Sequence, residues 1–277
     1  MTDDYSGRIR VACQTYTWEM LGDDWRGSVT DLLDWISGAG YEGIEITNNM
    51  IADFYDRPAD FAAACAERDL ALAAFAYASP SGSGFTDADR LDDDLAGARR
   101  AIEFVRHFPG ARLELGGAAN PSREDIWAKL DQALLFYSEA GRLAAEAGVP
   151  ACVHPHSHFG SLLESAEEYA YMLDRLDPAC ANFCPDTGHI VRGGQDLLTC
   201  LRANLPRIIH VHLKDADANR KWVGLGEGLC DYPAVFDLLE SAGYDGWVVA
   251  EEESAAAREN GVAAINRNRA YLRSIGY

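Results

Sequence analysis

The sequence predicts an α/β protein, a single (β/α)8 TIM barrel occupying residues 1–277. Apolar, strand-like runs alternate along the chain with Ala- and Leu-rich stretches of helical periodicity, as in a parallel sheet covered by helices. The alternation repeats eight times in about 250 residues without an evident linker, which is typical of a (β/α)8 barrel. A doubly wound open sheet is the alternative, but the segment Cys13–Met20, after the first run, lacks the glycines of a phosphate-binding turn.

The first half of the chain contains four strand-like runs, each followed by a helical stretch. The expected strands are Arg8–Cys13, Gly43–Thr47, Leu70–Ala78 and Ala111–Gly116. The expected helices are Val29–Ala39, Ala59–Arg68, Ala88–Phe108 and Arg123–Ala147. Glycines at the ends of the first and last of these helices support their boundaries. The Ser-, Gly- and Pro-rich segment Ser79–Phe85 is expected to form a loop.

Four strand-like segments of the second half each end at a potential metal ligand. They are Val149–His156, Cys180–His189, Arg207–Asp215 and Gly246–Glu253. The helices expected between them are Ala166–Leu176, Asp196–Asn204 and Tyr232–Ala242. An ionised group at the end of a buried strand needs a compensating partner. In a (β/α)8 barrel the chemistry lies at the C-terminal ends of the strands. The sequence therefore predicts a divalent metal at the mouth of the barrel, at the ends of strands five to eight.

The composition excludes several classes of partner. The net charge of −20 argues against nucleic acid and against an anionic membrane surface.

The seven cysteines form no CxxC pair, so we expect free thiols in a reducing compartment. The N-terminal segment has no apolar signal-peptide core, and no run approaches the roughly 18 apolar residues of a membrane span. We therefore expect a cytoplasmic protein.

The tetrapeptide Asp186–His189 reads DTGH and closes the sixth expected strand. The Asp186 carboxylate suits a hard or borderline divalent ion. His189 either binds the ion as well or donates a hydrogen bond to one of its ligands. The alternative for Asp186 is a cap on the following helix, because Asp is common at helix N-termini.

The seventh strand carries His210 and His212 on one face, because side chains alternate along a strand. Imidazole is a common metal ligand, so one of the two is expected to bind the ion while the other packs beside it. Lys214 follows on the same face. At the rim of the barrel it either neutralises a substrate oxyanion or transfers a proton, or it forms a salt bridge.

His154 and His156 share a face at the end of the fifth strand, and His158 follows in the next loop. Three histidines within five residues indicate that at least one acts in the site. The acidic run Glu251–Glu253 ends the eighth strand, with its first and third side chains on one side. The apolar residues before Glu251 bury it, which favours a ligand over a solvated acid.

Four further residues have two interpretations each, and Trp222 has one. Glu45 and Glu114 lie in apolar segments and either hydrogen-bond substrate hydroxyls or belong to buried ion pairs. Tyr16 and Trp18 either form an apolar wall for a sugar ring or belong to the core. Trp222, with the glycines that follow it, is expected in a loop over the mouth of the site.

Four motifs occur in a fixed order: DTGH, HVHLKD, GEGLCDYPAVF and GYDGWVVAEEE. In this ordered set the chain resembles the xylose-isomerase-like TIM-barrel superfamily, which contains the sugar phosphate isomerase/epimerase family. The resemblance implies one divalent ion and no other cofactor. The implied ligands are His154, Asp186, His212 and Glu251. Manganese is the ion we expect first, with cobalt, magnesium, iron and zinc as alternatives.

Within this superfamily the chain resembles the inosose dehydratase branch most closely. His154 stands where the epimerases of the family have a Glu that also acts as an acid or base. The resemblance implies proton removal from a carbon next to a carbonyl, with the metal stabilising an enediolate as a Lewis acid. The implied catalytic residues are four. Glu251 is expected to act as a metal ligand and as a possible base. The other three are expected to donate protons or to bind an oxyanion: His156, His189 and Lys214. The expected function is that of a metal-dependent lyase or isomerase, a dehydratase or an isomerase/epimerase, acting on a keto-sugar or keto-cyclitol.

Two other functions are alternatives. The first is a metal-binding barrel subunit of a two-subunit, deglycosidase-type enzyme that cleaves glycosides. The second is an apurinic-site endonuclease-like protein, which resembles this chain in fold but uses three zinc ions and a basic DNA face that a net charge of −20 disfavours. Homo-oligomers are common in such families, although no repeat or coiled coil in the sequence indicates one.

Overall fold

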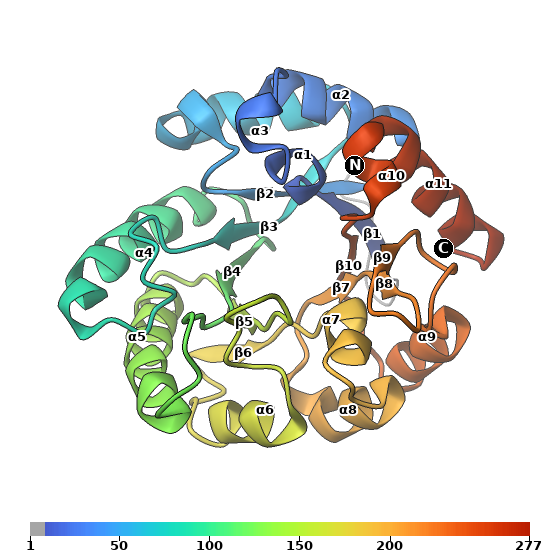
Figure 1. Cartoon of the computed structure of the whole chain (residues 1–277). Coiled ribbons are helices and arrows are strands. Elements are labelled where there is room, and N and C mark those ends of the chain that lie inside the picture. The colour runs from blue at the N-terminus through green and yellow to red at the C-terminus, as the bar shows by residue number, and fades with distance from the viewer. Residues whose placement is uncertain (1–8) are drawn as a thin grey trace.

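A computed structural model describes residues 9–277 and has the predicted barrel, with a ring of helices around a central parallel sheet (Figure 1). The sheet has eight strands in the order β6-β5-β4-β3-β2-β1-β10-β7. The strands are β1 (Arg10–Gln14), β2 (Gly43–Thr47), β3 (Ala71–Tyr77), β4 (Arg112–Gly116), β5 (Ala151–His154), β6 (Ala181–Phe183), β7 (Val211–Leu213) and β10 (Trp247–Ala250). Their C-terminal ends meet on one face of the barrel, because neighbouring strands pair in parallel.

The two ends of this sheet, β6 and β7, are joined by isolated parallel bridges. One bridge pairs Phe183 with Ile208 and the other pairs Asp186 with His212. The His212 N–H donates to the Pro185 carbonyl at 2.9 Å. Closure of the barrel therefore places Asp186 directly beside His212, although the two residues are far apart in the chain.

The outer ring consists of eight longer helices. They are α2 (Val29–Ala39), α3 (Pro58–Ala66), α4 (Leu91–Val105), α5 (Ile126–Glu146), α6 (Ala166–Leu173), α8 (Leu197–Asn204), α9 (Tyr232–Ser241) and α11 (Gly261–Ser274). Local sequence sets several of their starts. The side chains of Ser28 and Ser165 accept hydrogen bonds from the backbone of Asp31 and Glu168, whose carboxylates bond back to the serine N–H groups. These capping boxes begin α2 and α6.

Shorter elements fill the loops. They are the helices α1 (Tyr16–Glu19), α7 (Thr187–Arg192) and α10 (Ala255–Glu259), the 3-10 turns η1 (Gly22–Asp24), η2 (Ala52–Asp56), η3 (Ala88–Arg90) and η4 (Leu205–Arg207), and the hairpin of β8 (Asp215–Ala216) and β9 (Trp222–Val223). Within residues 9–277, no helix is both long and apolar enough to cross a bilayer.

The eight strands and seven helices expected from the sequence are present, and most boundaries differ by a few residues. The largest difference is at Cys180–His189, where only Ala181–Phe183 is a strand. Pro185 has no N–H for a ladder, and Asp186 begins helix α7 instead. Arg8, the expected start of the first strand, lies outside the described residues, as does most of the N-terminal segment in which we looked for a signal peptide. The closing helix α11 was not predicted.

Buried polar side chains gather at the C-terminal ends of the strands. Beneath them the barrel interior is filled by Ala12, Ala73, Trp247 and Val249, which form a buried apolar cluster of their own. The polar layer contains Gln14, Glu45, Glu114, His154, His210, His212 and Glu251, each at most 5 % exposed. So many buried charges at one end of a core indicate a functional site, since each is unfavourable unless it is compensated.

Candidate metal centre and active site

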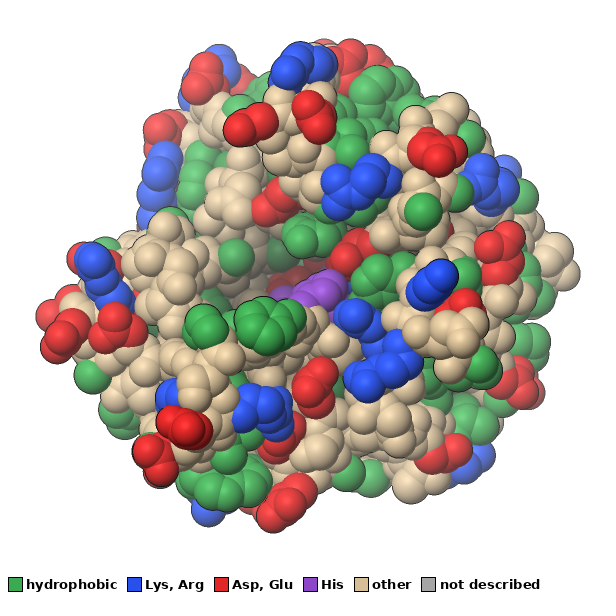
Figure 2. All heavy atoms as spheres, in the orientation of Figure 1, with side chains coloured by type: hydrophobic (Ala, Val, Ile, Leu, Met, Phe, Trp, Pro, Cys, Tyr) green, Lys and Arg blue, Asp and Glu red, His purple; other side chains and the backbone are tan. Residues whose placement is uncertain are grey.

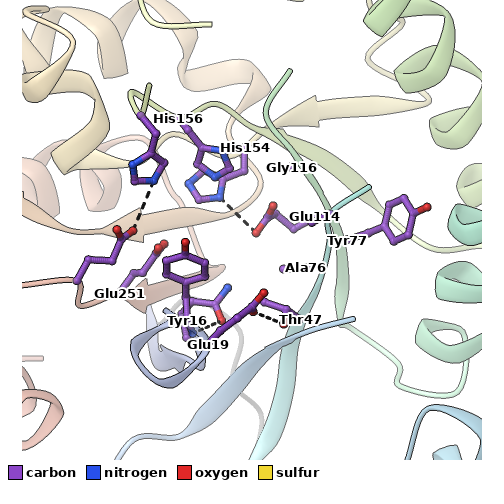
Figure 3. A pocket seen from close by; sticks show the side chains of 14 residues that line it. Tyr16, Glu19, Thr47, Ala76, Tyr77, Glu114, Gly116, His154, His156 and Glu251 are labelled. Atoms are coloured by element: carbon purple, nitrogen blue, oxygen red, sulfur yellow. Dashed lines mark hydrogen bonds and ion pairs between the residues drawn. The ribbon is translucent and has the colours of Figure 1, made fainter. Parts of the chain in front are cut away.

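The four side chains expected to bind a metal come together in the structure. His154 ends β5, Asp186 begins α7, His212 lies on β7 and Glu251 follows β10. Each offers one ligand atom, and all four atoms lie within 4.8 Å of one another. All four side chains are buried, and His154 and Glu251 line the cavity seen in Figure 3.

Three buried atoms of this cluster have no hydrogen bond; one of them, His212 Nε2, still has a close ion-pair contact with Glu45, and the other two do not. The Nε2 of His154 and the Oδ2 of Asp186 are buried, unbonded and 3.7 Å apart. The other Asp186 oxygen accepts the His189 backbone N–H at 2.7 Å, so Asp186 is both the helix cap and a member of the cluster. Buried polar atoms are rarely left unsatisfied. Two imidazoles and two carboxylates form a donor set that fits manganese, iron, cobalt or zinc.

Glu45 on β2 lies behind the cluster and bridges both histidines of β7. Its Oε2 is 2.6 Å from His210 Nε2, its Oε1 is 2.8 Å from His212 Nε2, and Gln14 donates to it at 2.8 Å. Burial alone would raise the pKa of Glu45, but His212 and His210 outweigh it and hold the pKa below its ordinary value. Glu45 does not line the cavity. Of its two interpretations, the buried ion pair is confirmed.

Glu114 on β4 forms a buried ion pair, and its contact with substrate hydroxyls stays a prediction. Its Oε2 lies 3.3 Å from His154 Nδ1, and its side chain also lines the cavity. Burial and His212 act to lower the pKa of His154, but Glu114 and Asp186 prevail and raise it to about 9. Carboxylates behind a ligating histidine fix its orientation and strengthen it as a donor.

Lys214 is buried rather than exposed at the rim. Its Nζ donates to Glu251 Oε1 at 2.9 Å, also contacts Glu253, and lies 4.5 Å from the centre of the Trp222 ring. Burial would raise the pKa of Glu251, but Lys214 and His212 hold it well below its ordinary value. Glu251 and Glu253 thus lie on one side, as strand alternation predicts. Glu252 points away and accepts from Asn268.

His189 has a proton position fixed by the backbone. The Ser157 N–H donates to its Nδ1 at 2.8 Å, so the neutral ring carries its proton on Nε2. That nitrogen faces the Lys214 Nζ at 3.4 Å. Burial and Lys214 lower the pKa of His189 well below its ordinary value, and burial does the same for His156. Both rings are therefore neutral near pH 7.

Other groups of ligand atoms occur nearby. His158, His189 and Glu253 form one such group. The Lys214 ammonium already contacts Glu253 and faces His189, so a cation there would meet a positive charge. The four-residue cluster has no such ammonium group among its members and contains the two unpartnered atoms, which makes it the candidate metal site.

A cavity of about 220 Å³ opens above the cluster, and Figure 2 shows the hollow with histidine at its floor. Tyr16 lines it, whereas Trp18 is buried and packs against Trp35, so Trp18 belongs to the core and contact of Tyr16 with a sugar ring stays a prediction. Trp222 lies in the β8–β9 hairpin, with its ring centre 4.9 Å from that of His189, and so covers this edge of the site as expected.

The cavity lining includes polar side chains that the sequence analysis did not identify. Gln14 ends β1, Glu19 lies in α1 and Thr47 ends β2. Polar residues at the ends of the first two strands were the available signal. The strand ends of the second half of the chain are rich in histidine and gave the stronger signal for a site.

The family described as xylose isomerase-like TIM barrel matches residues 33–275. The chain belongs to this family. Inosose dehydratase from Geobacillus thermodenitrificans is 33% identical over 168 residues, which cover 54% of this chain and 55% of that protein. Inosose dehydratase from Bacillus anthracis is 33% identical over 155 residues, or 50% of each chain. The chain spans about half the length of these relatives.

Solved structures show the same fold at lower identity. The 3-keto-D-glucoside 4-epimerase from E. coli superposes with a TM-score of 0.77 at 19% identity, covering 96% of this chain and 100% of that one. The IOLI protein, solved with a bound zinc atom, gives a TM-score of 0.77 at 14% identity, covering 96% and 98%. These similarities concern the barrel of this xylose isomerase-like protein, not its chemistry.

The glycine-rich segment Gly224–Gly228 of this family member wraps around Asp215. The carboxylate accepts from four backbone N–H groups, at Ala216, Gly226, Gly228 and Cys230, over 2.9 to 3.1 Å. A Cβ at Gly228 would lie 2.3 Å from Asp215 Oδ1, which explains the glycine there. The motif therefore shapes the loop beside the site.

Replacing Asp215 with Asn is expected to destabilise the protein by about 2–5 kcal/mol. The side chain is fully buried. The NH2 group of Asn would replace one carboxylate oxygen, so the two backbone N–H groups that this oxygen accepts would face a donor instead. Urea denaturation measures the loss. Asp217→Asn is the matched control. Asp217 is only half-buried and accepts two backbone N–H groups on the same oxygen, which an Asn oxygen can also do, so little change is expected. Equal stability of the two variants would contradict this account of the loop.

Proposed function

We propose that this protein is a divalent-metal-dependent lyase or isomerase that acts on a keto-sugar or keto-cyclitol, with inosose dehydration as its first candidate reaction. The observation that carries the proposal is the buried cluster of His154, Asp186, His212 and Glu251, with two unpartnered ligand atoms, beneath a cavity of about 220 Å³. The identity to inosose dehydratases over half the chain supports the substrate class.

A divalent ion in this cluster would act as a Lewis acid on a substrate carbonyl and so acidify the neighbouring carbon. We propose that His156 is the base that accepts the proton from that carbon, because its ring is neutral and lines the cavity. The low pKa of Glu251 suits a ligand better than a base. In dehydration the C–O bond to a neighbouring hydroxyl breaks. Lys214 lies behind the cavity lining, so we propose that it supplies the proton with which the hydroxyl leaves as water by way of Glu253, a lining carboxylate that it contacts. His189 also lies behind the lining, with its Nε2 3.4 Å from the Lys214 Nζ, and we assign it a positioning role there.

Turnover in D2O tests the proposal. The protein is loaded with manganese, cobalt, magnesium, iron or zinc and incubated with inososes and a panel of keto-sugars, and the products are analysed by mass spectrometry. Dehydration removes one water per molecule. Isomerisation or epimerisation keeps the composition and introduces deuterium at the carbon that was deprotonated. If every substrate returns unchanged and without deuterium under all loading conditions, the proposed function is wrong.

A further inference from the structure

The wall of the cavity opposite the metal cluster has a chemistry of its own. Tyr16 and Glu19 from α1 and Thr47 from β2 lie across the cavity from His154 and His156 (Figure 3). A substrate whose carbonyl faces the cluster presents its far edge to this wall. The residues there decide which far edges fit.

Glu19 is held in place from behind by two donors. Its Oε2 accepts the Thr47 hydroxyl at 2.5 Å, and its Oε1 accepts the Asn49 amide at 2.7 Å. Each carboxylate oxygen can accept a second hydrogen bond. The carboxylate is thus fixed in position and keeps free acceptor capacity toward the cavity, where a substrate hydroxyl is a suitable donor.

Tyr16 stands beside it as a donor. Burial, Glu251 and Glu19 all raise the pKa of Tyr16, so the phenol stays protonated. The Tyr16 backbone N–H is bonded to the Gln14 side chain at 3.1 Å, which holds this turn. A hydroxyl-bearing ring edge therefore meets one acceptor and one donor at fixed positions.

The charge around the cavity is strongly negative. Four carboxylates line it, and no lysine or arginine does among residues 9–277. Lys214 is paired with Glu251 and Glu253. Arg192 is bonded to the Ser157 carbonyl at 3.0 Å and lies over Trp222, outside this lining. Even a divalent ion leaves the lining acidic, so a phosphate or carboxylate on the substrate would be repelled.

We propose that Glu19, together with Tyr16, is a specificity-determining residue that binds hydroxyls on the far edge of a neutral polyol and excludes phosphorylated or carboxylated analogues. The inference rests on the proposed function in one respect, that the substrate occupies this cavity. It adds the residue that selects between neutral and anionic substrates of the same reaction.

Calorimetric titration of the manganese-loaded protein with 2-keto-myo-inositol and with myo-inositol 1-phosphate tests this inference. The wild type should bind the neutral ketone in clear preference to the phosphate. Glu19→Gln keeps the shape but removes the charge, and should reduce that preference about tenfold or more, with manganese affinity unchanged. Glu67→Gln is the matched control, because it removes one exposed carboxylate at the end of α3 and should leave the preference unchanged.

The possible failures are distinguishable. If the wild type binds and converts neutral keto-cyclitols while Glu19→Gln retains the same preference, the role of Glu19 is wrong and the proposed function stands. If the wild type binds the phosphate as tightly as the ketone, the exclusion of anions is wrong. If the wild type converts no ketone but Glu19→Gln still shifts the binding preference, the proposed function fails and the assignment of Glu19 survives.

Discussion

Asp186→Asn is expected to weaken manganese binding roughly a hundredfold or more and to abolish turnover at ordinary metal concentrations. The substitution replaces Oδ2, the unpartnered oxygen of the cluster, with an amide nitrogen that cannot bind a cation, and removes a negative charge. The fold should survive, because the Asn oxygen can still accept the His189 N–H and Asn is a good helix cap. Titration of bound manganese by electron paramagnetic resonance measures the affinity.

The next helix provides the control for this variant. Asp196 begins α8 and accepts the Thr199 N–H at 2.8 Å, in the same capping arrangement but on the surface and outside the cluster. Asp196→Asn should therefore retain wild-type metal affinity and turnover. If Asp186→Asn behaves like this control, Asp186 is only a helix cap and the assigned cluster is wrong.

Lys214→Met is expected to reduce turnover by about 10²–10⁴-fold while leaving one bound metal per chain, because removal of a proton-transfer group typically has this effect. Methionine preserves much of the length of the buried side chain and removes only its ammonium group. The pairing of Glu251 and Glu253 with that group is also lost, so some loss of thermal stability accompanies the change.

Lys221→Met provides the comparison, since Lys221 is exposed on the same β8–β9 hairpin. It should retain both activity and stability. Metal content, kcat and melting temperature are measured for both variants. If Lys214→Met is merely less stable but fully active at low temperature, Lys214 forms only a buried salt bridge, which was the alternative interpretation of its place in the sequence.

The fold was predictable because its signals are local and repeated. Alternation of apolar strands with helices, counted eight times, gave the barrel, and the period of two in a strand placed His210 and His212 on one face. The sixth strand shows the limit of such patterns. Asp186 was interpreted either as a ligand at a strand end or as a helix cap, and its two oxygens take part in different contacts.

Contacts between distant segments were not predictable. Thr47 and Asn49 lie about thirty positions from Glu19, and the pairing of β1 with β2 brings them together. The burial of Lys214 depends on Glu251 and Glu253 from another strand. Glu45 forms a buried ion pair because β7, which carries His210, lies across the barrel interior from β2. The sequence alone does not show that arrangement. Sequence periodicity shows the direction of a side chain, not its partner.

We propose that the four-residue cluster holds a single metal ion, and elemental analysis of the purified protein tests this most directly. The protein is stripped with a chelator, reloaded with manganese, cobalt, iron, magnesium or zinc, and separated from free ion before analysis. We expect one divalent ion per chain, lost in Asp186→Asn and retained in Asp196→Asn. Three zinc ions per chain, or no bound metal after any loading, would contradict the account.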